Sequence, residues 1–268
     1  MPWFAWLLIA LGVASIVVFV RIYPIDQPSP DHARNDTAVI VDQLSSLQEN
    51  EDFIIEVIKE LEDYGFKIDL YQGDDITVEF YRQLPTHGYK LIIFRAHSGL
   101  LVQNGEVIWR TVLFTNEEYS SSGYVLEQIL GQLVMGTACE GCYPVMFGIT
   151  PEFISTEIST GKITSMEGRF YDTVVIMMGC SGICLPDLAK AFVDKGASVY
   201  LAWDDSVSLY YVDEATSYLM RQLCSGNLSI KEAVDSTMAV IGADPEYGAE
   251  LKYYPSSNGD KTLGELIK

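Results

Sequence analysis

An uninterrupted run of five apolar residues, 174–178, constrains the fold of this chain more than any other feature. β-Branched residues lead the run, which is typical of a strand buried on both faces, as in the parallel sheet of an α/β protein. Gly179 and Cys180 follow at once, and residues 185–195 have helical spacing. We therefore predict that Cys180 lies at the carboxyl end of a buried strand, where open α/β sheets bind ligands.

A second apolar run, 91–94, has the same form and is followed by His97 and Gly99. Parallel strands have their carboxyl ends at the same edge of a sheet, so we expect imidazole and thiol to come together there. A histidine can take the proton of a thiol, and a glycine lets a substrate approach the backbone. The pair predicts cysteine-based nucleophilic catalysis. The alternative is that Cys180 is a buried structural cysteine.

Strand and helix patterns alternate from residue 38 onward. Runs at 38–41 and 67–71 predict strands, and helical patterns follow at 49–64 and 75–84. This rhythm predicts a parallel sheet with right-handed crossovers. The fold class that we predict is α/β, a three-layer sandwich with a mostly parallel sheet and helices on both faces, in one domain over 38–268.

The remainder of the chain adds a ribbon and more α/β elements. Asn104-Gly105 between apolar residues predicts a β-hairpin beside the site. The other predicted elements are a polar surface loop at 115–123, a helix at 124–135, a strand at 197–202, and helices at 209–224 and 229–241.

The first residues differ from the rest of the chain. Residues 3–20 are an apolar run of 18 residues, just long enough to cross a bilayer. Tryptophans at one end and Arg21 at the other are typical interface anchors. We predict a single-pass membrane protein with a transmembrane anchor at 1–22 and a linker at 23–37, and a cleaved signal peptide is the alternative. Arg21 and Arg34 weakly favour a cytoplasmic domain, but the side of the membrane stays open.

The formal net charge of −20 argues against a nucleic-acid partner, which requires a basic footprint. It fits a basic peptide or protein substrate, although an acidic balance also describes an ordinary solvated surface. Cys139 and Cys142 form one Cys-x-x-Cys pair, which needs a second ligand pair to hold zinc. No metal and no cofactor are expected. The pair could be a local disulfide or two free thiols.

In this order, the motifs resemble the caspase-like cysteine peptidases, the group that includes caspases, gingipains, clostripain, separase and CHAT domains. The resemblance spans about residues 38–240. It rests on His97-Ser98-Gly99 after one strand, on Gly179-Cys180-Ser181-Gly182 after a later strand, and on Gly196-Ala197 before a strand that ends near Trp203. It implies a caspase-like sandwich and an endopeptidase activity.

The resemblance also implies roles for individual residues. Cys180 would be the nucleophile, His97 would transfer protons, and the backbone N–H groups of Gly99 and Cys180 would form an oxyanion hole. Trp203, Asp204 and Asp205 would line the substrate pocket, and a carboxylate there would select Arg or Lys before the scissile bond. The same two aspartates could instead lie in a solvated loop or cap a helix.

The chain also departs from the family pattern. Ser98 stands where most members have glycine, and Met178-Gly179 stands where caspases have Gln-Ala. These differences place the chain nearer to the CHAT, separase and clostripain-like relatives than to caspases. They leave open a catalytically silent caspase-like module that binds a basic partner at the membrane. A thiol–disulfide protein using Cys139 and Cys142 is a third, weaker alternative. An acidic pocket would also make Lys162 and Arg169 candidate self-cleavage sites.

Overall fold

The computed structural model describes residues 37–103, 106–137, 145–155 and 165–268. Its main sheet has six strands in the order β10-β9-β8-β3-β1-β2, all parallel to their neighbours except β10, which runs antiparallel to β9. The strands of this sheet are β1 (Thr37–Asp42), β2 (Lys67–Gln72), β3 (Leu91–Arg95), β8 (Thr173–Met177), β9 (Ala197–Trp203) and β10 (Leu251–Tyr254). The predicted mixed α/β fold with a mostly parallel sheet is confirmed.

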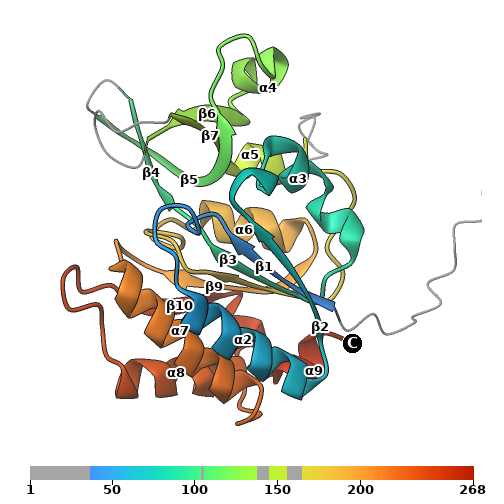
Figure 1. Cartoon of the computed structure of the whole chain (residues 1–268), viewed down its shortest axis with the longest axis vertical. Coiled ribbons are helices and arrows are strands. Elements are labelled where there is room, and N and C mark those ends of the chain that lie inside the picture. Colours follow the sequence, from blue (N-terminus) through green and yellow to red (C-terminus); the bar gives the residue numbers. More distant parts are fainter. Residues whose placement is uncertain (1–36, 104–105, 138–144, 156–164) are drawn as a thin grey trace, which may run out of the picture. The chain divides into compact units, whose positions relative to one another are not determined.

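Helices cover both faces of the main sheet (Figure 1). The α-helices are α2 (Glu51–Tyr64), α3 (Val78–Gln83), α4 (Val125–Ile129), α5 (Pro151–Ile154), α6 (Pro186–Asp194), α7 (Leu209–Leu223), α8 (Ile230–Val240) and α9 (Leu263–Leu266). One apolar core lies between the sheet and α2, α7, α8 and α9, and a second lies between the sheet and α3, α5 and α6. The layers therefore follow from the alternation of side chains along the central strands.

The two central apolar runs form strands of one parallel sheet, as predicted, and the structure shows that they are neighbours. All residues of β3 and β8 are buried, and their register pairs Phe94 with Met177. The N–H of Met178 donates to the Phe94 carbonyl at 2.9 Å, which continues the pairing past the strand ends. The carboxyl ends of the two strands therefore lie level at one edge of the sheet.

A second, antiparallel sheet has the strand order β4-β5-β7-β6. Its strands are β4 (Ser98–Gln103), β5 (Glu106–Glu118), β6 (Leu133–Gly136) and β7 (Met146–Ile149). β4 and β5 form the predicted ribbon, although residues 104–105 of its turn lie outside the described ranges. The prediction of a loop at 115–123 is wrong in its first part, because Thr115 is fully buried and β5 continues to Glu118 beside β7.

The predicted helix at 124–135 is also wrong in part. Only α4 is helical, and Gly131 follows it with a φ of +69°. The chain then continues as β6, whose pairing with β7 could not be inferred from local spacing. Strand β10 falls in the tail, for which no regular structure was predicted.

Asp187, near the start of α6, joins the second sheet to this helix. Its carboxylate accepts hydrogen bonds from the Thr111 N–H at 2.8 Å and from the Thr111 hydroxyl at 2.7 Å. Thr111 lies on β5 and is fully buried. The ribbon is therefore fixed against the helix that follows the cysteine strand.

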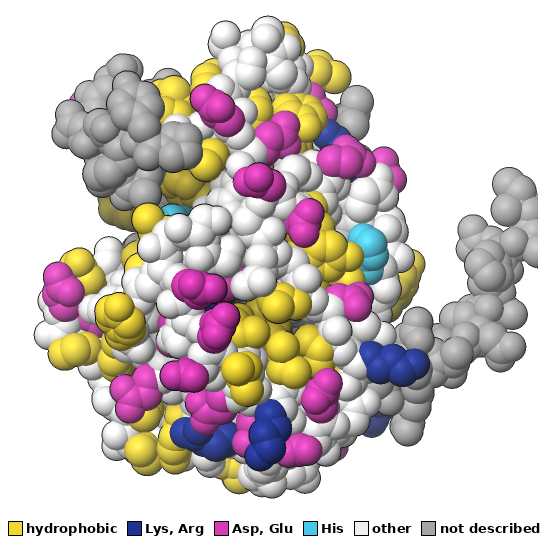
Figure 2. Space-filling view, viewed as in Figure 1, with side chains coloured by type: hydrophobic (Ala, Val, Ile, Leu, Met, Phe, Trp, Pro, Cys, Tyr) yellow, Lys and Arg dark blue, Asp and Glu magenta, His cyan; other side chains and the backbone are white. Residues whose placement is uncertain are grey.

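The predicted anchor at 1–22 and the predicted linker at 23–37 lie outside the described residues, except for Thr37. Among the helices that the structure describes, none is both long and apolar enough to cross a membrane. Figure 2 shows acidic side chains spread over one face of the molecule, with few lysines and arginines among them.

Candidate functional site

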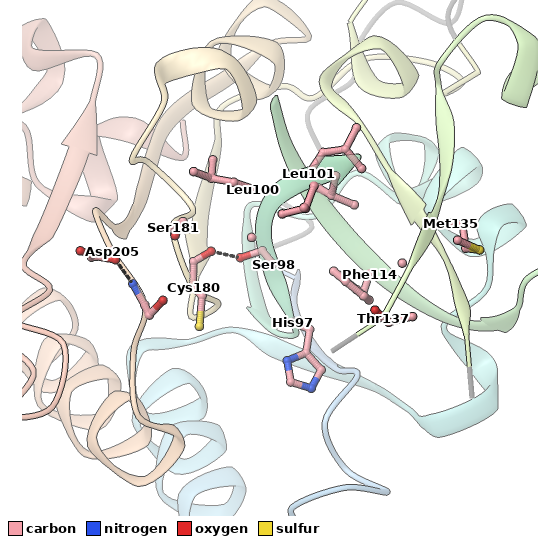
Figure 3. A pocket seen from close by; sticks show the side chains of 15 residues that line it. His97, Ser98, Leu100, Leu101, Phe114, Met135, Thr137, Cys180, Ser181 and Asp205 are labelled. Atoms are coloured by element: carbon pink, nitrogen blue, oxygen red, sulfur yellow. Dashed lines mark hydrogen bonds between the residues drawn. The ribbon is translucent and has the colours of Figure 1, made fainter. Parts of the chain in front are cut away.

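His97 and Cys180 each follow a central strand by the same number of residues. His97 is the third residue after Phe94, Cys180 is the third after Met177, and these two strand residues are paired. Both side chains line one cavity of about 850 Å³ (Figure 3). Imidazole and thiol therefore lie at the same sheet edge and share one cavity, and their joint role in catalysis stays a prediction.

Gly179 allows the two strand ends to approach each other. A Cβ atom at this position would collide with the Ser98 hydroxyl and with the carbonyl oxygen of Ala96. The Ser98 hydroxyl donates to the Cys180 carbonyl at 2.7 Å, a contact drawn in Figure 3. After the cysteine, Ser181 has a φ of +53°, which turns the chain toward α6. The glycine thus serves a close backbone contact.

The Cys180 thiol is free and half-buried. Its sulfur accepts the Val207 N–H at 3.4 Å and lies 3.8 Å from the carbonyl oxygen of the same residue. These are weak hydrogen bonds, so the sulfur is positioned without being blocked. Cys139 and Cys142 lie outside the described ranges, and the prediction for that pair stays untested.

The His97 backbone is held by Gln43, whose side-chain oxygen accepts the His97 N–H at 2.9 Å. Gln43 is held in turn by Asn116, because its Nε2 donates to the Asn116 Oδ1 at 2.6 Å. The imidazole packs edge-on against Phe114, with ring centroids 6.0 Å apart. Two segments distant in sequence, the residue after β1 and the strand β5, therefore fix one histidine.

The Nε2 atom of His97 is buried and has no hydrogen-bond partner among the described residues. An imidazolium ion needs both of its N–H groups paired or solvated, so this environment favours the neutral ring. Burial accordingly lowers the pKa of His97. Figure 3 shows the other ring nitrogen on the side of Cys180, so Nδ1 faces the cavity. A neutral ring with its proton on Nε2 leaves Nδ1, on the side of Cys180, as a proton acceptor.

The cavity has two unlike walls. One wall is the loop between β9 and α7, with Asp205 and Ser206, together with Ser181. The other wall is apolar and belongs to the second sheet; its members are Leu100, Leu101, Val102, Val112, Phe114 and Met135. His97 and Cys180 therefore lie between an acidic loop and an apolar sheet.

Of the three residues predicted to line a substrate pocket, Asp205 lines this cavity. Its backbone oxygen accepts the Ser181 N–H at 2.8 Å, and its Oδ1 accepts the Ser206 N–H at 2.7 Å. Asp204 instead accepts the Glu250 N–H at 2.7 Å and lies 3.9 Å from Lys252. Trp203 is 1% exposed and packs against Tyr211 in the core.

The structure brings Gly99 into the lining of the same cavity. Gly99 pairs with Val112 in the ribbon, and a Cβ atom there would meet open space. The oxyanion-hole role predicted for the N–H groups of Gly99 and Cys180 stays a prediction.

The two candidate self-cleavage sites fall in different places. Lys162 lies outside the described residues. Arg169 is exposed, and its guanidinium donates to the Asp194 carbonyl at 3.2 Å.

Sequence reasoning missed a buried charge cluster beside the site. Arg95 donates to both oxygens of Asp213, at 2.8 and 3.0 Å, and to Asp42 at 2.8 Å. The signal was a charged residue directly after the apolar run 91–94. Its partners lie on β1 and α7, and their spacing in the sequence does not reveal the contact.

Within the described ranges, no group of three or more histidine, cysteine, aspartate and glutamate side chains is arranged to hold a metal ion. Comparison of the chain with protein-family models and with curated proteins finds no match.

Proposed function

We propose that the chain is a cysteine endopeptidase of the caspase-like type, with His97 and Cys180 as its catalytic dyad. The observation that carries the proposal is that two paired, fully buried parallel strands are followed by a free thiol and an imidazole that line one cavity. The resemblance of the motifs to caspase-like peptidases supports it independently. The apolar run at 3–20 would hold the enzyme at a membrane.

In the proposed reaction, Nδ1 of His97 takes the thiol proton and the sulfur adds to the carbonyl carbon of the scissile bond. The C–N bond then breaks, the proton passes from His97 to the leaving amine, and a thioester to Cys180 remains. Water adds to the thioester carbonyl and gives a proton to His97. The C–S bond then breaks, the carboxylic acid product leaves, and His97 returns its proton to the sulfur, which restores the thiol.

Asp205 is the proposed selector of a basic residue before the scissile bond. It lines the cavity on the cysteine side, and its carboxylate can pair with a guanidinium or an ammonium group. Asp204 and Trp203 are not part of this proposal, because their side chains are engaged elsewhere.

The test uses full-length protein in detergent with fluorogenic peptides that carry Arg, Lys or Asp before the reporter. Cleavage after Arg and Lys is expected, with no activity in Cys180→Ala and a loss of roughly 10²–10⁴-fold in His97→Ala. Asp205→Asn should remove most of the preference for Arg. Cleavage that persists in Cys180→Ala would refute the dyad.

The second candidate is a silent module that binds a basic partner. The unpartnered Nε2 of His97 favours it, since a working histidine is usually oriented through its second nitrogen. Binding of Arg-rich peptides that is lost in Asp205→Asn, with no cleavage of any peptide, would support this module over the peptidase.

A further inference from the structure

The apolar wall of the cavity carries large apolar side chains that are exposed to solvent. Val102 is 59% exposed and Met135 is 58% exposed in the described structure, and both line the cavity beside the dyad. Exposed apolar groups gathered in a concave site are typical of binding surfaces. We therefore expect an apolar group of a ligand to pack against this wall.

Phe114 connects this wall to the catalytic histidine. Its ring packs edge-on against the His97 imidazole, and it also lies against Gly136 on β6. A Cβ atom at Gly136 would lie 2.7 Å from the Phe114 ring, so the ring can occupy this position only because residue 136 has no side chain. The wall therefore begins at His97 and continues to Met135 on the same strand as Gly136.

The proposed chemistry fixes the direction of a bound peptide. In Figure 3, Asp205 lies on one side of Cys180, while His97, Phe114 and Met135 lie on the other. A basic residue before the scissile bond would extend toward Asp205. The leaving amine must reach His97, so the residue after the bond would extend toward Phe114 and Met135.

We propose that this wall is a subsite for a bulky apolar residue, such as Leu, Phe or Met, directly after the scissile bond. The inference rests on the proposed function and narrows its substrate class to peptides with Arg or Lys followed by an apolar residue. Burial of the apolar side chain against Phe114 and Met135 supplies the selectivity.

The test uses internally quenched peptides of one sequence with Arg before the bond and Leu, Phe, Ser or Asp after it. With full-length protein, kcat/KM for the Leu and Phe peptides should exceed that for the Ser peptide by roughly 10-fold or more. The Asp peptide should have the lowest kcat/KM. Met135→Ser should lower the Leu-to-Ser ratio several-fold. Ile129→Ser is the matched control, because Ile129 is 77% exposed on α4 outside the cavity, and it should leave the ratio unchanged.

Two outcomes separate this inference from the proposed function. Equal rates for Leu, Ser and Asp, with cleavage that needs Cys180, would overturn the subsite and keep the peptidase. If no peptide is cleaved, the same peptides are titrated against Cys180→Ala protein by fluorescence anisotropy. The subsite would stand and the peptidase would be refuted if the Leu peptide binds about 10-fold more tightly than the Ser peptide. This difference in affinity should then be smaller in the Cys180→Ala, Met135→Ser double variant. Equal binding would refute the subsite.

Discussion

Two groups of polar side chains stand at the same edge of the main sheet, and they are built in opposite ways. Arg95, at the end of β3, is fully buried and makes three hydrogen bonds to Asp42 and Asp213. His97, two residues later, leaves one ring nitrogen without a partner among the described residues. Cys180 makes only weak contacts through its sulfur.

The difference lies in how completely the polar atoms of the two groups are paired. A buried charge is tolerated when its donors and acceptors are paired, and the Arg95 cluster meets this condition through β1, β3 and α7. In the pair of His97 and Cys180 this pairing is incomplete, and both side chains line an open cavity. We infer that the first group holds the strand ends together and that the thiol and the cavity-facing Nδ1 of the second are left for a substrate.

The largest effect is expected for the charge cluster. Asp213→Ala leaves the Arg95 guanidinium buried with one carboxylate fewer, so the free energy of unfolding should fall by about 3–5 kcal/mol. Urea denaturation followed by circular dichroism measures this loss. The matched control is Asp235→Ala, which removes an exposed pair with Lys231 and should leave the urea midpoint almost unchanged. Equal losses in the two variants would contradict a structural role for the cluster.

The next effect concerns the contact between the two strand ends. Gly179→Ala places a methyl group against the Ser98 hydroxyl and the Ala96 carbonyl, so we expect a loss of about 1–3 kcal/mol in the free energy of unfolding. Gly99→Ala is the control for stability, because a Cβ atom there meets open space. Thermal unfolding of both variants gives the comparison. A Gly179→Ala protein as stable as Gly99→Ala would show that the strand ends do not need this close approach.

The sequence predicted the part of the fold that local patterns encode. The runs 91–94 and 174–178 became central strands because burial on both faces requires apolar residues throughout. The positions of His97 and Cys180 at one edge followed from strand ends alone. Strand β6 was read as helix because its pairing with β7 is a tertiary contact.

The lining of the site was harder to predict for the same reason. Asp204 accepts an N–H group from Glu250, next to the unpredicted strand β10, and this contact separates it from Asp205. Trp203 faces the core because it packs with α7. Gln43 lies 54 positions from His97, and no spacing rule connects them. Such contacts depend on how the layers are assembled.

A smaller effect is expected from the residue that holds the His97 backbone. Gln43→Ala removes the acceptor of the His97 N–H, so the imidazole should lose its fixed position and kcat should fall roughly 10-fold. KM should change little, because Gln43 does not line the cavity. The matched variant is Gln72→Ala, whose amide donates to Asp42 of the charge cluster and not to the dyad. If Gln43→Ala and Gln72→Ala change kcat and KM by the same amounts, Gln43 has no specific role in positioning His97.

The smallest effect is a pH dependence of stability that belongs to His97. Its pKa in the folded protein is lowered by burial, whereas an unfolded histidine has a pKa near 6.5. Between these two values the unfolded chain binds more protons than the folded one, so stability should fall as the pH drops below about 6.5 and should be unaffected above about 7.5. The slope from one such group cannot exceed about 1.4 kcal/mol per pH unit.

The measurement compares the melting temperatures of wild type and His97→Gln between pH 7.5 and pH 5. The decline toward low pH should be shallower in His97→Gln, because this variant lacks the group that takes up a proton on unfolding. His87→Gln is the control for the loss of one histidine, because His87 is exposed and precedes the amino end of β3. Parallel curves for wild type and His97→Gln would mean that the imidazole is as easily protonated in the folded protein as in the unfolded chain. The contrast between a satisfied charge cluster and an unsatisfied dyad would then lose its electrostatic basis.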